Sequence, residues 1–316
     1  MHISHSRVNA YLGCPYSHYL RYVEGLSSNK PARPLYFGSD FHKLLEVRNN
    51  PLTVTEAAAQ IQENFWEMKP QFQEELGENY VQDLLSIFED YQDIYKDCPQ
   101  PTLTEQRFEI PMGKFKGDTV YFVGVIDEIY GTGDSIKIGE HKTFTRKPDQ
   151  SLLVMNQQKC LYAKACEHMY GVMPESVIWD YIHSKPADEP VWLEKSKRFS
   201  AAKSAKITPY SWKRACEKRG ITDEAVLSAG EKYADNIPNY FFRVEQDYIP
   251  EMVDSIWEGF KYTAKLICKH GKENKTKHLT PSCAWCSYQP ICYAEMTGGN
   301  REYLIEKDFT KNERKE

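Results

Sequence analysis

The sequence lacks long apolar segments. Its first residues, MHISHSRVNA, contain no apolar core of a signal peptide, and no run of eighteen apolar residues occurs in the 316-residue chain. It also lacks internal repeats and low-complexity tracts. We therefore expect a cytoplasmic protein that makes no use of a membrane.

An excess of positive charge is also absent. The net charge is −5, with 27% charged and 41% hydrophobic residues, which is ordinary for a globular protein of one large or two modest domains. This balance argues against a protein that coats nucleic acid indiscriminately. A local basic groove stays open, because phosphate contacts depend on where charge lies. Basic runs, each of which could equally be a solvated face, occur at 143–147, 195–206 and 269–278.

Cysteine, by contrast, is abundant. Nine cysteines in a chain expected in a reducing compartment favour metal or cluster ligation over disulfides. Cys283, Cys286 and Cys292 form a C-x2-C-x5-C group, which resembles a metal site without its fourth ligand. Cys14, in LGCPY, is the best candidate for that ligand. The spacing alone does not separate zinc from an iron–sulfur cluster.

Residue periodicity predicts helices first, then a three-strand meander, then further helices and strands. Ser39 or Asp40 is the expected N-cap of the second helix. Because of the meander, we expect an α/β or α+β sheet with helices on both faces rather than an all-parallel sheet. The expected helices are 6–26, 37–47, 54–68, 71–97, 149–170, 208–234 and 250–272, and the expected strands are 107–112, 119–131, 135–143, 175–184, 190–196 and 239–249.

Two of these strands carry acids on faces that should be buried. In IKIGEHKTF (136–144), alternation places Glu140 and Lys142 on the face of the isoleucines, and in the preceding strand Asp127 shares a face with Val123 and Val125. Neighbouring strands lie roughly 5 Å apart, so the two carboxylates can meet. Buried like charges repel unless a cation lies between them. The pattern predicts a Mg²⁺ or Mn²⁺ site, although acids satisfied by surface cations remain the simpler alternative.

Lys142 has a separate expected role at such a site. Its ammonium could orient an attacking water or stabilise negative charge in the transition state. His42, on the helix 37–47, is a candidate ligand or a boundary histidine. Gln158 and Tyr162 lie one helical turn apart on 149–170, where they could hydrogen-bond a phosphate or stack on a base.

Together these residues resemble the RecB-like branch of the PD-(D/E)xK nuclease superfamily. The likeness is to its iron–sulfur subset, which includes the AddB nuclease domain and the small CRISPR-associated exonucleases. GSDFHKLLE resembles motif I, VGVIDEI motif II and GEHKT motif III, while QKCLY fits the Q-x-x-x-Y motif. The matches run in the family's order from residue 4 to 292.

The resemblance implies a restriction-endonuclease-like α/β core with a mixed central sheet flanked by helices. It implies that His42, Asp127 and Glu140 bind the divalent ion together with the His141 backbone carbonyl, and that Lys142 is the catalytic lysine. Gln158 and Tyr162 would contact DNA. The cysteines at 14, 283, 286 and 292 would hold a [4Fe–4S] cluster that staples the chain ends together. Glu46 and Glu105 would have supporting roles only.

The resemblance also implies one nuclease domain over 1–316. Its parts are a helical region at 1–100, a catalytic sheet at 101–184, an insert at 185–245 and a C-terminal cluster segment at 246–316. The insert resembles those of phage-encoded relatives, and we expect it to guide DNA. The chain has no G-x-x-x-x-G-K-[ST] loop, so it is not a fused helicase–nuclease.

The predicted function is a metal-dependent DNA exonuclease that acts on single strands or frayed ends. One alternative is a DNA-end binding or trimming subunit that depends on partner proteins in a recombination, replication or integration complex. A second is a zinc-stapled RNA-processing nuclease. Cleavage polarity and strand preference do not follow from these residues.

Overall fold

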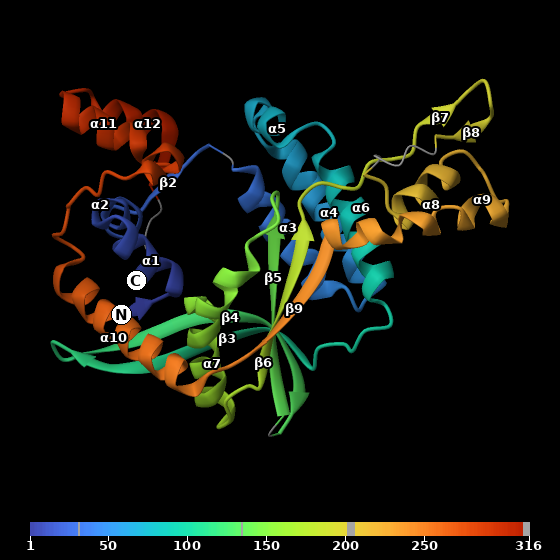
Figure 1. Cartoon of the computed structure of the whole chain (residues 1–316). Coiled ribbons are helices and arrows are strands. Elements are labelled where there is room, and N and C mark those ends of the chain that lie inside the picture. Colours follow the sequence, from blue (N-terminus) through green and yellow to red (C-terminus); the bar gives the residue numbers. More distant parts are fainter. Residues whose placement is uncertain (31, 134, 201–205, 312–316) are drawn as a thin grey trace.

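A mixed sheet forms the centre of the molecule (Figure 1). The computed structural model describes residues 1–30, 32–133, 135–200 and 206–311. The strand order is β1-β4-β5-β6-β9, and β3 pairs with β4. The strands are β1 His2–Ile3, β3 Leu103–Phe115, β4 Asp118–Thr132, β5 Ser135–Phe144, β6 Ser176–His183 and β9 Phe241–Asp247.

The strand directions confirm the expected mixed sheet. The meander β3-β4-β5 is antiparallel, as its short connections require. β5 and β6 are parallel, and the crossover between them runs through helix α7, Gln157–Tyr170. β9 then returns antiparallel to β6.

Helices cover both faces of the sheet. On one face α7 and α10, Pro250–His270, pack their apolar sides against strand residues such as Phe122 and Trp179. On the other face α3, Arg33–Val47, and α6, Tyr80–Tyr95, pack with Ile182 and Phe241. Helices α4, Pro51–Glu67, and α5, Pro70–Leu76, complete that side. Within the described ranges, no helix is both long and apolar enough to cross a bilayer.

The two ends of the chain lie together, beside one end of the sheet (Figure 1). Strand β2, Leu26–Ser28, pairs antiparallel with β10, Phe309–Lys311. Leu20, Ile291 and Phe309 belong to a small separate core at this junction. The helices here are α1 His5–Gly13, α2 Pro15–His18, the π-helical turn Tyr19–Val23, α11 Gln289–Thr297 and α12 Arg301–Asp308, with a 3₁₀ turn at Pro281–Trp285.

The described residues of the expected insert (185–245) that precede β9 form a compact unit away from the sheet (Figure 1), whereas its last residues, 241–245, belong to β9 of the central sheet. Phe199, Trp212 and Tyr233 belong to its own small core. Arg214 pairs with the buried carboxylate of Asp90 on α6, which ties the insert to the helical layer. Part of the basic run 195–206, residues 201–205, lies outside the described residues. Its elements are the hairpin β7 Trp192–Leu193 and β8 Arg198–Phe199, the helices α8 Pro209–Glu217 and α9 Glu224–Ser228, and the 3₁₀ segment Glu231–Asn239.

Several predicted boundaries are wrong for identifiable reasons. The helix expected over 6–26 breaks at Cys14, because Pro15 starts a new helix. The one expected over 71–97 breaks at Gly77, whose φ of +94° a helix cannot contain. Ser39 and Asp40 lie inside α3 rather than at its N-cap, which is Ala32.

Three further expectations need correction. The helix expected over 149–170 begins at Gln157, where the Asn156 side chain caps it, and a 3₁₀ turn, Gln150–Met155, precedes it. The strand expected over 190–196 shrinks to the two residues of β7. On β4, Val123 and Val125 are only half-buried. The face of the strand that they share with Asp127 is therefore less buried than expected.

Candidate active site

The acids of the two central strands lie where β4 and β5 part. Their ladder ends at the pair Glu128–Gly139, and Asp127 and Glu140 are the next residues beyond it. The backbone N–H of His141 donates to Asp127 Oδ2 at 2.9 Å instead of continuing the ladder. This point of separation between β4 and β5, here called the fork, brings the predicted pair of acids to one place.

Glu140 organises the side chains around it. Its Oε1 accepts from Lys142 Nζ at 2.6 Å and from Gln158 Nε2 at 2.7 Å. Lys142 also donates to Gln158 Oε1 at 3.0 Å. Glu140 Oε2 is buried and has no hydrogen-bond partner among the described residues. A buried carboxylate oxygen without a donor is costly, and a cation would satisfy it.

His42 reaches the fork from α3. Its Nδ1 lies 3.7 Å from Asp127 Oδ1. Burial, together with the nearby charges of His141 and Lys142, lowers the pKa of His42 to about 4. The ring is therefore neutral near pH 7, which is the form that binds a metal ion.

Glu105, expected to have only a supporting role, lies close enough to His42 and Asp127 to bind the same ion. Ligand atoms of His42, Glu105 and Asp127 all lie within 4.8 Å of one another, the one such group found in the described part of the chain. Glu105 lies on β3 between the residues paired with Glu128 and Ile126, and its φ is +48°. That conformation is strained for glutamate and persists only where its surroundings impose it.

The electrostatics of these acids favour a bound cation. Burial and the charge of Glu140 raise the pKa of Asp127 well above its usual range. Burial and the charge of Glu46 likewise raise the pKa of Glu105. Carboxylates at such distances ionise together only when a cation compensates them. Three carboxylates and a neutral imidazole are a fitting ligand set for a hard divalent ion such as Mg²⁺ or Mn²⁺.

Comparison with known families agrees with this geometry. A sequence profile of the PD-(D/E)XK nuclease superfamily matches residues 2–293. The chain belongs to this superfamily. Its fold class is as expected from the sequence, and membership indicates a metal-dependent nuclease.

Other comparisons are more distant. The chain is similar to a solved structure described as "Crystal structure of SSO0001", with 91% of this chain and 92% of that chain covered, 13% identity and a TM-score of 0.30. A similarity of this size carries no property over to the present chain. Among curated protein sequences, no significant match was found.

The two residues expected to contact DNA lie on the α7 side of this nuclease site. Gln158 is held by Glu140 and Lys142, as described above. Tyr162 lies one turn further along α7, and its ring packs edge-on against Phe108 with centroids 5.7 Å apart. Burial and the charge of Glu140 raise the pKa of Tyr162, which places its hydroxyl near the same acid.

Sequence reasoning missed the side chain of His141, which points to the opposite side of the sheet. Its Nε2 lies 3.0 Å from Glu128 Oε1 and its Nδ1 lies 3.4 Å from Asp180 Oδ2. Burial alone would lower the pKa of His141, but the two carboxylates outweigh burial and raise it to about 10. Arg48 pairs with Glu128, and Arg243 with Asp180. A row of alternating buried charges therefore crosses the sheet behind the site.

A sequence signal for this row did exist. Asp180 stands between Trp179 and Tyr181 in VIWDYIH, and Arg243 stands between Phe242 and Val244 in FFRVE. Such charges are rarely buried unless they are paired. The pairing partners themselves come from neighbouring strands, and register alone reveals them: Asp180 lies opposite both His141 and Arg243.

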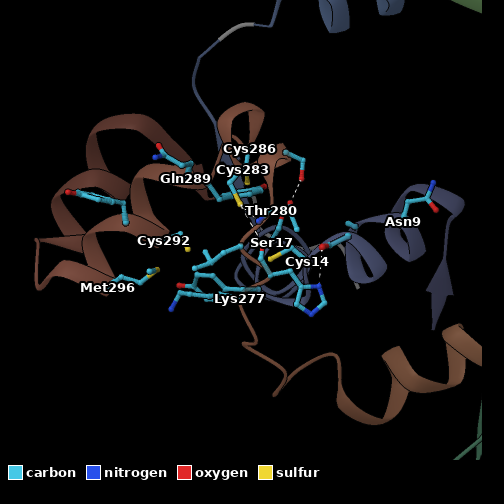
Figure 2. A pocket seen from close by; sticks show the side chains of 18 residues that line it. Asn9, Cys14, Ser17, Lys277, Thr280, Cys283, Cys286, Gln289, Cys292 and Met296 are labelled. Atoms are coloured by element: carbon cyan, nitrogen blue, oxygen red, sulfur yellow. Dashed lines mark hydrogen bonds between the residues drawn. The ribbon is translucent and has the colours of Figure 1, made fainter. Parts of the chain in front are cut away.

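The four predicted cluster cysteines share one pocket, far along the molecule from the acids. Figure 2 shows Cys14, Cys283, Cys286 and Cys292 on the wall of this pocket, which has a volume of about 340 Å³. All four side chains are partly buried. Burial raises the pKa of the Cys292 thiol, the charge of Lys277 opposes this, and Cys14 and Cys283 add to the increase. Thiols that disfavour one another's ionisation in a largely apolar pocket are a fitting ligand set for a bound cationic centre.

Proposed function

We propose that this chain is a RecB-like DNA exonuclease that hydrolyses phosphodiester bonds at single-stranded or frayed ends. The observation that carries the proposal is the fork itself. His42, Glu105 and Asp127 have ligand atoms within 4.8 Å of one another where β4 and β5 separate. Glu140 is outside that close group but is the next residue beyond the last ladder pair, and Lys142 is hydrogen-bonded to it. In the proposed reaction, the ion ligands and the ammonium would act on one substrate phosphate.

The proposed roles follow from the position of each group. His42, Asp127 and Glu140, with the His141 carbonyl, would hold Mg²⁺ or Mn²⁺, and Glu105 would add a further oxygen. When bound, the ion activates water and offsets phosphate charge. Lys142 would stabilise the negative charge that develops on the phosphate. Burial lowers the pKa of Lys142, but the charge of Glu140 outweighs it and raises the pKa, so the ammonium stays protonated.

Substrate contacts would come from both sides of the fork. Gln158 fixes Lys142, and Tyr162 offers a stacking face worth about 1–3 kcal/mol per base. The basic insert around Lys195 would add phosphate contacts, so binding should weaken as salt rises. The chain 1–316 would be one nuclease domain, and the part of the predicted insert 185–245 that precedes β9 would be an appendage, which the small core of that part supports.

The shared cysteine pocket supports a [4Fe–4S] cluster held by Cys14, Cys283, Cys286 and Cys292. Zinc is the rival occupant. Zinc–thiolate distances of about 2.3 Å would bring tetrahedral sulfurs to within roughly 3.8 Å of one another. In the described chain, no three of these thiols have sulfurs within 4.8 Å of one another. The cysteine side chains would therefore have to rotate to hold zinc.

Digestion of end-labelled DNA tests the proposed activity. Linear single-stranded DNA should be degraded from its ends with Mg²⁺ or Mn²⁺, while closed circular single strands should be spared. Equal rates on both would indicate an endonuclease. Cleavage of RNA alone would select the RNA-processing alternative, and activity only with added proteins the partner-dependent one.

Anaerobic purification tests the cluster separately. A [4Fe–4S] centre should give a brown protein with iron, whereas stoichiometric zinc without iron would decide for zinc. The Cys14→Ser variant should lose the centre, because this residue alone supplies a ligand from the N-terminal side of the pocket.

A further inference from the structure

A second polar cavity lies behind the nuclease site. It has a volume of about 370 Å³ and is formed by the end of α3, one side of α6, the loop 98–100, β4 and β9. None of the candidate ligands, nor Lys142, lines it. The family resemblance assigns no role to the residues around it, and the proposed nuclease reaction does not use them.

Three cations line this cavity. Arg48 and Arg243 each direct one guanidinium nitrogen inward, to Glu128 and Asp180 respectively. In the described part of the chain, no hydrogen-bond partner is found for the other terminal nitrogen of either guanidinium. Lys96 is exposed and has no charged partner among the described residues. Asp93 is the only acid among the lining residues.

Aromatic contacts hold the arginines in place. The guanidinium carbon of Arg243 lies 3.8 Å from the ring centroid of Tyr95. Tyr130 also lines the cavity, and its hydroxyl donates to Glu128 Oε2 at 2.6 Å, which fixes the acid that anchors Arg48. Fixed guanidinium groups lose little freedom when they bind an anion, and their planar N–H groups match phosphate oxygens.

We propose that this cavity binds a phosphate monoester group, either as inorganic phosphate or as the 5′-phosphate of a mononucleotide. Glu128 and Asp180 already balance part of the charge of the two arginines, so Lys96 supplies the uncompensated positive charge, and the unused N–H groups of the two arginines supply the donors. The same arginines anchor the carboxylates on either side of His141. A bound phosphate would therefore contact the same arginines whose partner carboxylates flank His141, the residue between Glu140 and Lys142.

Calorimetric titration of the full-length protein in EDTA tests the site without loading the nuclease centre. Inorganic phosphate and a deoxynucleoside 5′-monophosphate are titrated at constant ionic strength, and each should bind with one saturable site per chain. If the mononucleotide binds more tightly than inorganic phosphate, the ligand is a nucleotide. If the two affinities are equal, the ligand is free phosphate. No saturable binding of either would overturn the proposal.

Charge variants locate the site. Lys96→Glu should weaken binding roughly tenfold, the size expected for reversing one charge near a phosphate dianion at the surface. Asn49→Asp, at the exposed rim, should act in the same direction. The matched control is Lys265→Glu on α10, which is exposed and does not line this cavity.

A variant of the nuclease site tests whether the phosphate binds there instead of in this cavity. Lys142→Ala should leave phosphate binding in EDTA unchanged. If Lys142→Ala abolishes binding, or if Lys96→Glu and Lys265→Glu weaken it equally, the phosphate is bound elsewhere and the proposal is wrong. Because metal and cleavage are absent from this measurement, its outcome is independent of the proposed exonuclease activity.

Discussion

At the scale of single residues, the site is an arrangement of acids that is unfavourable without a cation. Asp127 and Glu140 lie beyond the last ladder pair, and burial with mutual repulsion raises the pKa of Asp127. The sequence pattern predicted both residues because alternation puts them on faces where aliphatic residues are expected. The pattern did not predict that Glu105 lies among the possible ligands. Its φ of +48° is imposed by the folded surroundings and has no signal in the neighbouring sequence.

Asp127→Asn should separate catalysis from stability. Cleavage should fall by more than the roughly 100-fold that loss of a supporting residue typically costs, since a ligand is lost. In EDTA the variant should unfold at a higher temperature than the natural protein, because one member of a repelling pair becomes neutral while the amide oxygen still accepts from His141. Turnover at the natural rate, or a lower unfolding temperature in EDTA, would contradict the assignment.

Glu105→Gln tests whether this residue is a ligand. If its carboxylate helps hold the ion, Mn²⁺ affinity measured by calorimetry should fall roughly 10- to 100-fold. Glu46→Gln is the matched control, because Glu46 is exposed and affects the site only through its charge on Glu105. A control variant that loses as much affinity as Glu105→Gln would leave Glu105 with a merely electrostatic role.

At the scale of elements, β5 serves two sides of the sheet. Alternation sends Glu140 and Lys142 toward α7, and His141 toward the charges of β4 and β6. The meander and the mixed sheet could be predicted from periodicity, because both follow from short-range patterns. The helix breaks at Pro15 and Gly77 had local signals that longer apolar periods masked. The single charges of the charge row behind the site gave a signal, but the pairing between them could not be predicted, because it depends on register between strands distant in sequence.

Asp180→Asn tests that charge row. The substitution leaves His141 and Arg243 without their shared carboxylate in a buried place, and breaking a buried ion pair costs about 3–5 kcal/mol. Urea unfolding of the metal-free protein should show a loss of that size. Glu217→Gln, on α8 and paired with the exposed Lys213, should cost less than about 1 kcal/mol. Equal losses in the two variants would mean that the buried row contributes no more than a surface pair.

At the scale of the whole molecule, the two chain ends are joined by polar contacts as well as by the cysteine pocket. Arg301 pairs with Glu24 and, at 2.8 Å, with Glu295. Glu295 also accepts from the Tyr16 hydroxyl and lies 2.9 Å from Lys277. These contacts belong to the described chain itself, so they stabilise the junction whatever centre the cysteines hold.

The pH dependence of this junction follows from Glu295. Burial alone would raise the pKa of Glu295, but the Tyr16 hydroxyl and the charge of Lys277 outweigh burial and lower it below its usual value of 4.5. A carboxyl with a lowered folded-state pKa stabilises the fold above its unfolded pKa and loses that contribution as pH falls through the folded value.

Glu295→Gln should therefore reduce the free energy of unfolding by about 2 kcal/mol at pH 7, the size expected for hydrogen bonds to a charged group. The difference from the natural protein should shrink as pH falls below about 4.5 and vanish in stronger acid, because Glu295 is then protonated in both states. Glu302→Gln is the control on the next helix, α12, since Glu302 is 77% exposed and lies 3.8 Å from Arg301, and it should cost under about 1 kcal/mol at either pH. A difference for Glu295→Gln that stays constant from pH 7 into acid would show that its charge does not hold the ends together.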